Sequence, residues 1–523
     1  MRTTRTAGVA RAARAIRSAG TIRVVSRDPA PRRSLAAALA DWKNTHTRRP
    51  ALLWWGWAAA LFALYATVGA RRHALIRTTG YDLGIFEQAV KAYAQLRAPV
   101  SPLRGEGFNL LGDHFHPVLV VLAPLYRLAP SPYTLLFAQA ALLAVAVVPL
   151  ARRARQALGR RAAHVVAFAY GLSWGIASAV AFDFHEVCFA VPLVSFALEA
   201  LALRRWGAAV AWAAPLLLVK EDLGLTLAAI GGYIAWKGRR RLGLTTAAAG
   251  LLGSALEFKA LMPFFSPAGT YAHAANLEPA HGSLLATLAF APLDAVRPEV
   301  KATTLVLVFA PAALIALRSP LAWIAVPTLG WRMLSQNPFH WGTSFHYTAV
   351  LMPVVLAAMT DALAPYRRAG DALGRRHVRA SLATTAAITL VLIPSFPLAQ
   401  VVHRSTWRST EHVAAARALL DRIPDGATVA ASNRLAPQLT SRTDVVLFPT
   451  YPVHWRLYDT GRQVPPPSAE WIVYDRVPPE SWPYPPGYWP YPRERQEAEL
   501  VKAEQAYGYR VVAQRDGITL LRR

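Results

Sequence analysis

Long apolar runs recur along most of the chain, and they constrain its fold more than any single motif does. A helix needs roughly 20 apolar residues to cross a bilayer core, where every backbone amide must be paired within the segment. The sequence predicts eleven such spans, at about 51–70, 133–150, 162–180, 187–203, 207–219, 223–236, 242–262, 303–318, 320–334, 346–364 and 380–398. We therefore expect a polytopic α-helical membrane protein of about eleven transmembrane helices.

The formal charge of +27 has to be interpreted from the places where the basic residues lie. In a soluble domain it would suggest a nucleic-acid partner, but 54% of this chain is hydrophobic. Arg and Lys concentrate at 1–50, 151–161, 204–205, 237–241 and 365–379. With eleven spans all five segments fall on one side, which the positive-inside rule makes cytoplasmic. The charge thus indicates membrane topology, and we expect no nucleic-acid partner.

The same topology divides the chain into three parts. Residues 1–50 form a basic cytoplasmic tail, expected to be disordered and to touch anionic lipid. Residues 51–400 form the transmembrane region, with a first outer loop at 71–132. Residues 401–523 alternate amphipathic-helix and short-strand patterns, which predicts a small extracytoplasmic α/β domain. The protein is therefore expected in the cytoplasmic membrane, with its N-terminus inside and its C-terminal domain outside.

Titratable side chains gather at the predicted outer ends of the spans, whereas the inner ends carry almost only Arg and Lys. Ionisable groups at membrane depth are costly and are usually functional or paired. The candidate catalytic residues are Asp82, Glu87, Asp113, His185 and Glu186. The candidates for binding substrate or phosphate are His114, His116, Lys220, Glu221, Asp222, Arg332, His340 and His346. This asymmetry predicts one reaction site on the outer side of the membrane.

Each of these groups also has a purely structural interpretation. Asp82 is placed to cap the helix predicted at 81–98. The histidines of the first outer loop, which precede a short interfacial helix expected at 116–129, suit interfacial contacts as well as metal ligation. Glu186 could form a salt bridge to Lys220. Lys220 could also form an ion cluster with its neighbours Glu221 and Asp222 in which the charges compensate one another. The two histidines near the last spans suit ordinary buried polar positions, so the sequence leaves both interpretations open.

Five blocks of the chain together resemble a known family. They are YDLGIFEQ, NLLGDHFHPVLVVLAPLYRL, DFHEVCFAVP, KEDLGL and HYTAVLMPVVLAA, within roughly residues 75–520. They resemble a prokaryotic family of multi-pass membrane proteins of unknown function, which is similar to the GT-C superfamily of integral membrane glycosyltransferases. The resemblance implies a GT-C-like fold and transfer of a sugar from a polyprenyl-phosphate donor to a glycan or lipid acceptor outside the membrane.

The resemblance also implies roles for single residues. GT-C enzymes keep an acidic residue on a juxtamembrane helix soon after the first span, and Asp82 matches that position. We expect Asp82 to act as general base on the acceptor hydroxyl or to orient it, with Lys220 and Arg332 neutralising the leaving phosphate. No second acid adjoins Asp82, so metal dependence stays open. If a divalent metal such as Mg²⁺ or Mn²⁺ is the cofactor, the candidate ligands are Asp82, Asp113 and His114.

Two other functions are compatible with the pattern. A lipid or sugar transporter or flippase would need ionisable residues at mid-membrane, and only Glu199 and Asp361 fall inside predicted spans, both near the cytoplasmic ends. A non-catalytic scaffold would use the outer α/β domain to recruit partners. The outer position of the acids favours transfer over transport.

Overall fold

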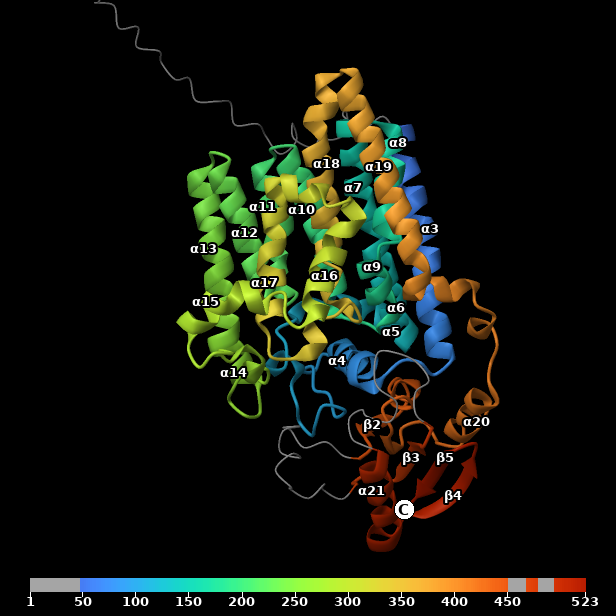
Figure 1. Ribbon diagram of the computed structural model, residues 1–523. Helices are drawn as coiled ribbons and strands as arrows, with labels where there is room; N and C mark the ends of the chain where they lie inside the picture. Colours follow the sequence, from blue (N-terminus) through green and yellow to red (C-terminus); the bar gives the residue numbers. More distant parts are fainter. Residues whose placement is uncertain (1–47, 450–466, 478–492) are drawn as a thin grey trace, which may run out of the picture. The chain divides into compact units, whose positions relative to one another are not determined.

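The computed structural model describes residues 48–449, 467–477 and 493–523. The described chain is mostly helical, with a small sheet near its C-terminus (Figure 1). The basic tail, apart from its last three residues, lies outside the described residues.

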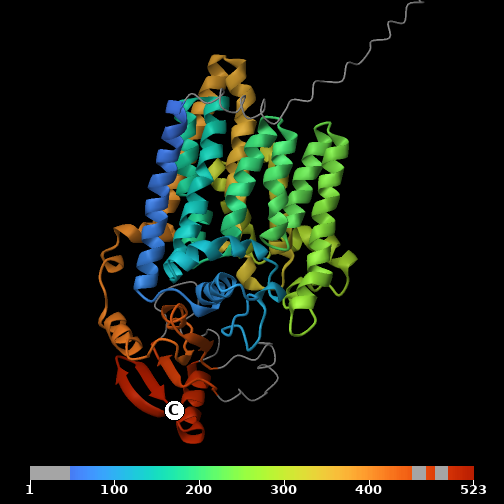
Figure 2. The ribbon, with the colours of Figure 1, turned by 180° about the vertical axis from the view of Figure 1, so that it is seen from behind.

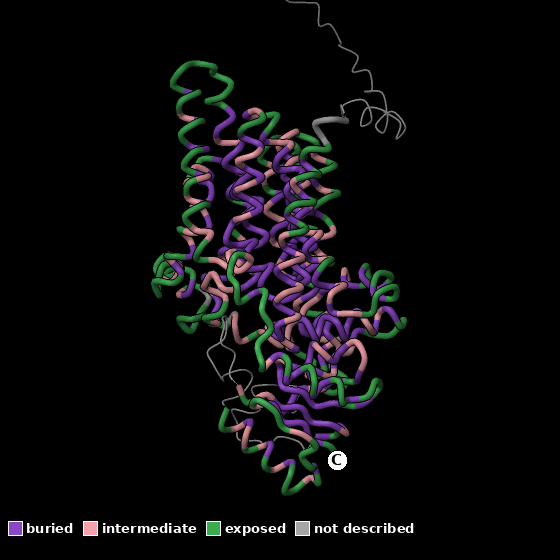
Figure 3. Tube along the Cα trace, turned by 90° about the vertical axis from the view of Figure 1, so that its right-hand side faces the viewer, coloured by how far each residue is buried: buried purple, intermediate pink, exposed green. Residues whose placement is uncertain are grey.

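Six helical segments are long and apolar enough to cross a membrane. They are Leu52–Ala74, Pro132–Leu158, Arg160–Ala181, Arg240–Phe265, His346–Ala369 and Ala372–Ser395. Each coincides with one of the predicted spans. In Figures 1 and 2 these segments run roughly parallel within one helical bundle, and Figure 3 shows buried residues concentrated in the middle of the bundle with exposed residues on its outside.

The predicted count of eleven spans is not confirmed. Several of the remaining apolar runs form shorter helices, such as Trp206–Leu218 and Leu223–Trp236. The predicted span at 303–318 is interrupted because Ala313 and Leu314 take left-handed backbone conformations, with φ of 49° and 60°. Apolarity alone therefore did not reveal where these helices break.

The helical elements have the following bounds. In the first half they are α3 (Arg48–Ala74), α4 (Ile85–Ala94), α5 (Ala123–Leu128), α6 (Pro132–Val145), α7 (Val147–Leu158), α8 (Arg160–Gly171), α9 (Trp174–Ala181), α10 (Ala190–Ala202), α11 (Trp206–Ala213) and α12 (Leu223–Trp236). In the second half they are α13 (Arg240–Leu256), α14 (Met262–Phe265), α15 (Leu284–Asp294), α16 (Glu299–Phe309), α17 (Val326–Leu334), α18 (Leu351–Ala369), α19 (Ala372–Leu392), α20 (Glu411–Leu420) and α21 (Arg493–Tyr507).

The helices α12 and α13 pack at very short range through glycine. A Cβ on Gly243 would lie 2.2 Å from the backbone nitrogen of Ala235, and one on Gly231 would lie 2.4 Å from that of Ala247. Small residues let helix backbones approach closely in membranes, where the lipid supplies little hydrophobic drive for association. This contact fixes the helix that follows the Lys220–Asp222 turn.

The C-terminal part forms one five-stranded sheet in the order β2-β1-β3-β5-β4. Its strands are β1 (Thr428–Ala431), β2 (Asp444–Leu447), β3 (Trp471–Asp475), β4 (Arg510–Arg515) and β5 (Ile518–Arg522). β1 pairs in parallel with β2 and β3, while β5 pairs in antiparallel with β3 and β4. With α20 and α21 this matches the small α/β domain predicted from the alternating patterns.

The loop between α3 and α6, predicted as the first outer loop, supplies two short helical segments instead of spans. A single π-helical turn, η1 (Gly80–Gly84), leads into α4, which lies across the ends of the long helices in Figures 1 and 2. The apolar stretch predicted as an interfacial helix forms a 3₁₀ segment, Pro117–Leu122, followed by α5. Both segments are too short to cross a bilayer, as expected.

Candidate functional site

One cavity of about 320 Å³ collects most of the residues singled out from the sequence. It is bounded by the first outer loop, by the turns that precede α10 and α12, and by the segments that follow α14 and α17. The predicted site residues that line it are Asp82, Asp113, His114, His116, His185, Glu186, Lys220, Glu221, Asp222, His340 and His346. Glu87 and Arg332 are not among its lining residues.

Asp82 and His185 lie within ion-pair distance of each other at the cavity wall. Nε2 of His185 lies 3.2 Å from Oδ1 of Asp82, and Nδ1 lies 3.1 Å from the carbonyl oxygen of Phe182. A carbonyl oxygen only accepts, so Nδ1 carries a proton. With Nδ1 protonated, the contact to Asp82 is an ion pair only when Nε2 carries a proton as well.

The turn that carries Asp82 also contacts a second carboxylate. The hydroxyl oxygen of Thr79 lies 2.7 Å from Oδ2 of Asp183 and 3.3 Å from Oδ2 of Asp82. Thr79, and not Asp82, occupies the N-cap position of η1. Burial, together with the charge of Asp82, raises the pKa of Asp183 to about 7. The tertiary structure thus places Asp183 beside the same threonine, although no acid adjoins Asp82 in the sequence.

Lys220 and Glu186 form a buried salt bridge that faces the cavity. Nζ of Lys220 lies 2.5 Å from Oε1 of Glu186. Burial raises the pKa of Glu186, but the ammonium group outweighs it and lowers that pKa to about 2. The structural interpretation of Glu186 is therefore correct, and both side chains still line the cavity. Oε2 of Glu186 has no hydrogen-bond partner among the described residues.

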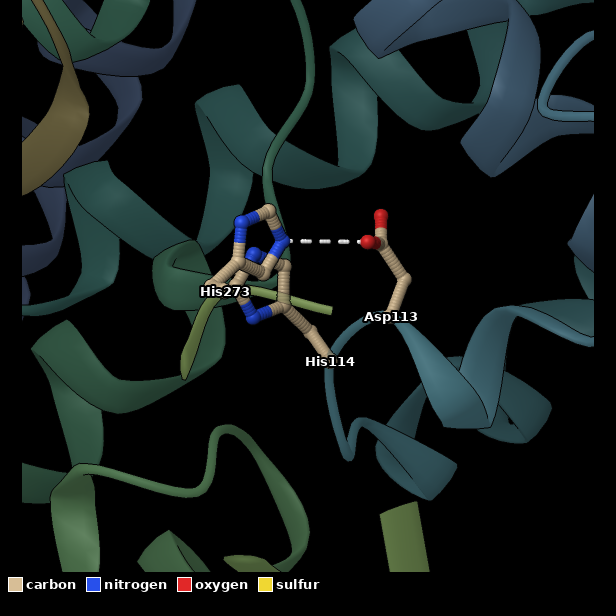
Figure 4. Close-up of side chains that lie close together, drawn as sticks. All are labelled: Asp113, His114 and His273. Carbon is tan, nitrogen blue, oxygen red and sulfur yellow. Dashed lines mark hydrogen bonds and ion pairs between the residues drawn. The ribbon is translucent and has the colours of Figure 1, made fainter. Parts of the chain in front are cut away.

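A second group of charges surrounds Asp113 (Figure 4). Arg104 contacts both carboxylate oxygens of Asp113, at 3.2 and 2.9 Å, and Nε2 of His273 lies 3.0 Å from Oδ1. The rings of His114 and His273 stack with centroids 4.7 Å apart. Burial raises the pKa of Asp113, but the guanidinium of Arg104 holds it well below its ordinary value. Asp113 is therefore an ionised, fully engaged carboxylate.

His114 is tied to the turn before α12. Its Nδ1 lies 2.6 Å from Oε1 of Glu221, and the backbone N–H of Phe115 donates to Oε2 at 3.2 Å. Burial lowers the pKa of His114, but the Glu221 carboxylate outweighs burial and the net shift is upward. The contact links the first outer loop to the Lys220 turn and fixes one wall of the cavity.

Several buried polar atoms at the cavity lack a hydrogen-bond partner among the described residues. They are both ring nitrogens of His346, Nδ1 of His116, Oδ1 of Asp222 and Oε2 of Glu186. The His346 ring stacks on His185 with centroids 3.8 Å apart. His340, by contrast, is satisfied because its Nδ1 lies 2.7 Å from the Ser335 hydroxyl. Buried polar atoms usually have partners, so these atoms indicate a place for water or a polar ligand.

Glu87 and Arg332 have other roles in the structure. The carboxylate of Glu87 accepts hydrogen bonds from Tyr126, at 2.8 Å, and from Thr440. The guanidinium of Arg332 donates to His340 O, Thr348 Oγ1 and Gly342 O at 2.8 to 2.9 Å. These contacts hold a helix against the C-terminal domain and shape the loop after α17. The roles predicted for Glu87 in catalysis and for Arg332 in phosphate binding stay predictions, and neither side chain lines the cavity.

Arg104 and His273 are among the lining residues that the sequence did not point to. Arg104 lines the cavity and also contacts the Tyr81 hydroxyl. Its signal was an arginine in a predicted outer loop, against the positive-inside trend. His273 follows the predicted span at 242–262 and lies in the sequence YAHAAN, which resembles the other polar outer segments. Nothing local linked His273 to Asp113, 160 residues earlier.

These features define a class, that of multi-pass helical membrane proteins with a charged cavity at the ends of their helices. Residues 72–520 match the family DUF2079, described as a predicted membrane protein, and the chain belongs to that family. The match covers nearly the same residues as the blocks identified in the sequence. A comparison with curated protein sequences gives no match.

The fold is similar to that of ArnT from Cupriavidus metallidurans. The crystal structure of ArnT bound to undecaprenyl phosphate matches with a TM-score of 0.53 and 14% identity, over 89% of this chain and 97% of ArnT. The apo structure matches with a TM-score of 0.53 and 13% identity, over 92% and 98% of the two chains. The expected resemblance to the GT-C fold is therefore confirmed. At this identity the likeness concerns the fold alone.

Proposed function

We propose that the protein transfers a sugar from a polyprenyl-phosphate donor to a glycan or lipid acceptor on the extracytoplasmic face. The observation that carries this proposal is the convergence of Asp82, His185, Lys220 and Arg104 on one cavity. A carboxylate that can take a proton and cations that can face a phosphate are the groups such a reaction requires. The ArnT structure with bound undecaprenyl phosphate supports a lipid phosphate as the partner.

In the proposed reaction the acceptor hydroxyl oxygen attacks the anomeric carbon of the sugar. The bond between that carbon and the phosphate oxygen breaks, and both electrons leave with the lipid phosphate. Asp82 takes the proton of the acceptor hydroxyl. The contact with His185 keeps the Asp82 carboxylate in place while it accepts the proton.

Lys220 and Arg104 stabilise the negative charge that develops on the leaving phosphate. Each is fixed by a buried carboxylate, Glu186 for the lysine and Asp113 for the arginine. Cations held in advance cost little reorganisation when the charge appears. Arg104 therefore takes the role that the sequence assigned to Arg332. The ring nitrogens of His346, which have no hydrogen-bond partner among the described residues, would bind sugar hydroxyls.

A divalent metal fits these residues only in part. Among the described residues, the ligand atoms of Asp113, His114 and His273 lie within 4.8 Å of one another, and Asp82 is not in this group (Figure 4). Mg²⁺ prefers several oxygen ligands, whereas this group offers two imidazoles and one carboxylate already engaged by Arg104. Mg²⁺ therefore fits poorly, and the proposed mechanism uses side chains alone.

Transfer to a membrane acceptor from a radiolabelled polyprenyl-phosphate sugar tests the proposal. Asp82→Asn and His185→Ala should each lower kcat by about 100-fold or more, as expected for loss of general-base catalysis. Asp425→Asn is the control, because that carboxylate lies on the C-terminal domain and its side chain is 81% exposed. Wild-type rates in both active-site variants would show that the cavity does not carry out this reaction.

The two acids inside predicted spans give no support to transport. Glu199 pairs with Arg152 at 2.9 Å, and Asp361 accepts a hydrogen bond from Ser319 at 2.8 Å. Both acids are therefore engaged in contacts within the helical region. If no sugar is transferred in this assay, the remaining hypothesis is a non-catalytic scaffold.

A further inference from the structure

The helical turn that carries Asp82 is held by the C-terminal domain. The first amides of any helix lack partners within it and must find them elsewhere. The N–H of Gly80 donates to the backbone oxygen of Asn433 at 2.6 Å, and the N–H of Tyr81 donates to Oδ1 of Asn433 at 2.9 Å. Asn433 thus satisfies two consecutive amides immediately before Asp82.

Asn433 occupies a rigid position. It follows β1, an interior strand paired with β2 and β3, and precedes the short 3₁₀ segment η16 (Ala436–Gln438). The preceding residue, Ser432, donates its N–H to Val473 of β3 at 2.9 Å and so extends the strand pairing. Asn433 itself is only 7% exposed. The acceptor atoms it offers are therefore fixed by the sheet.

The contact leaves no room at Gly80. A Cβ on this residue would lie 2.7 Å from Cβ of Ala436 and 3.2 Å from the backbone oxygen of Asn433. Real Cβ atoms essentially never approach a non-bonded heavy atom within 3.0 Å. The η1 turn and the C-terminal domain are therefore in direct contact at Gly80. The absence of a side chain lets the amides of η1 reach their acceptors.

Further contacts continue along α4. Nε2 of Gln88 donates to the backbone oxygen of Val445 in β2 at 2.8 Å, and Nζ of Lys91 donates to that of Thr440 at 3.1 Å. Together with the Glu87 contact to Thr440, these bonds fix how far α4 can slide or rotate against the domain. The position of Asp82 opposite His185 follows from that docking.

We propose that Asn433 is a positioning residue for Asp82, through which the C-terminal domain sets the geometry of the catalytic carboxylate. The proposal rests on the function proposed above. The proposal goes beyond that function because the C-terminal domain would influence the reaction by positioning Asp82, without contacting the substrate. Misplacement of a reacting group by about 1 Å can cost on the order of 100-fold in rate.

The kinetic test compares three variants of the full-length protein. Asn433→Ala removes the acceptor for the Tyr81 amide and should lower kcat about tenfold, with the KM for the donor unchanged. Asn433→Asp keeps an acceptor oxygen at the same place and should restore kcat. Gln438→Ala is the matched control, since the Gln438 side chain joins the same domain to the His73 carbonyl at 3.1 Å and makes no hydrogen bond to η1 among the described residues. It should retain wild-type kcat.

Hydrogen exchange supplies a readout that does not depend on activity. The peptide covering residues 79–84 should exchange faster in Asn433→Ala than in the wild type, and at the wild-type rate in Gln438→Ala. Faster exchange in a protein that transfers no sugar would refute the proposed function and still support the positioning of the turn. Unchanged exchange, or wild-type kcat in Asn433→Ala, would overturn the positioning role.

A second pair of variants tests the close contact between Gly80 of η1 and Ala436 of the C-terminal domain. Gly80→Ala should lower kcat because its methyl group meets Ala436, and adding Ala436→Gly should recover part of the loss. If Gly80→Ala is as active as the wild type, the close contact does not set the position of Asp82.

Discussion

At the scale of single residues, burial and charge give similar side chains different behaviour. Glu186 and Glu87 are both fully buried, yet the pKa of Glu186 falls to about 2 beside Lys220, whereas burial raises the pKa of Glu87 to about 7. The difference is the presence of a cation in direct contact. Glu186 is therefore an ionised partner in the cavity, and Glu87 is a structural acid that holds its proton more readily.

Glu87 should make stability depend on pH. Its pKa is raised from an ordinary 4.5 to about 7 in the folded protein, so its contribution is fully present below pH 4.5 and is lost as pH rises through 7. Thermal unfolding in detergent should show a melting temperature that falls from pH 5 to 8. Glu87→Gln should flatten this slope, whereas Glu504→Gln, an exposed change on α21, should not. Equal slopes in all three proteins would contradict the assignment.

At the scale of elements, helix packing decides which polar turns reach the cavity. The α12 and α13 pair holds the turn with Lys220 through glycine contacts, and α4 holds Asp82 through contacts with the C-terminal domain. Neither arrangement is visible from hydropathy, which reports only that a helix is apolar. The close approach of two backbones depends on which small residues face each other.

Two glycines of the α12 and α13 pair provide a test of this packing. Gly243→Ala should destabilise the protein by about 1 to 3 kcal/mol, because its Cβ would overlap α12. Gly232→Ala is the matched control, since a Cβ there meets nothing within 4 Å, and it should be neutral or stabilising by up to about 1 kcal/mol. Melting temperatures of the purified proteins measure both effects. Equal melting temperatures for the two variants would refute this account of the packing.

At the scale of the whole molecule, the charge distribution predicts its orientation in the membrane. The hairpin between α18 and α19 carries five of the arginines that we assign to the cytoplasm, and it lies at the opposite end of the long helices from the sheet in Figures 1 and 2. The cavity lies at the same end as the sheet. The proposed outer reaction site therefore depends on this orientation.

Cysteine labelling can establish the orientation. The single native cysteine, Cys188, is buried, and Cys188→Ala gives a cysteine-free background. In right-side-out vesicles a membrane-impermeant maleimide should label Asp425→Cys in the C-terminal domain but not Gly370→Cys in the hairpin between α18 and α19. Labelling of Gly370→Cys alone would place the domain in the cytoplasm and contradict the predicted topology.

The sequence by itself determined the class of fold and the segments that supply the site. It predicted eleven spans, of which six overlap helices long and apolar enough to cross a membrane, and a small C-terminal domain in the region where the structure has a sheet. These follow from local properties, since apolarity, strand alternation and the polar ends of helices are all readable within a few turns. Asp82, His185 and Lys220 were found in this way.

Only the tertiary structure decided which of these side chains meet. In the folded chain, Glu87 and Arg332 do not line the cavity, whereas Arg104 and His273 do. Asn433 contacts the turn that carries Asp82. The physical reason is that convergence depends on how each helix is rotated and where it breaks. Those features are set by contacts between residues up to several hundred positions apart, which no local pattern records.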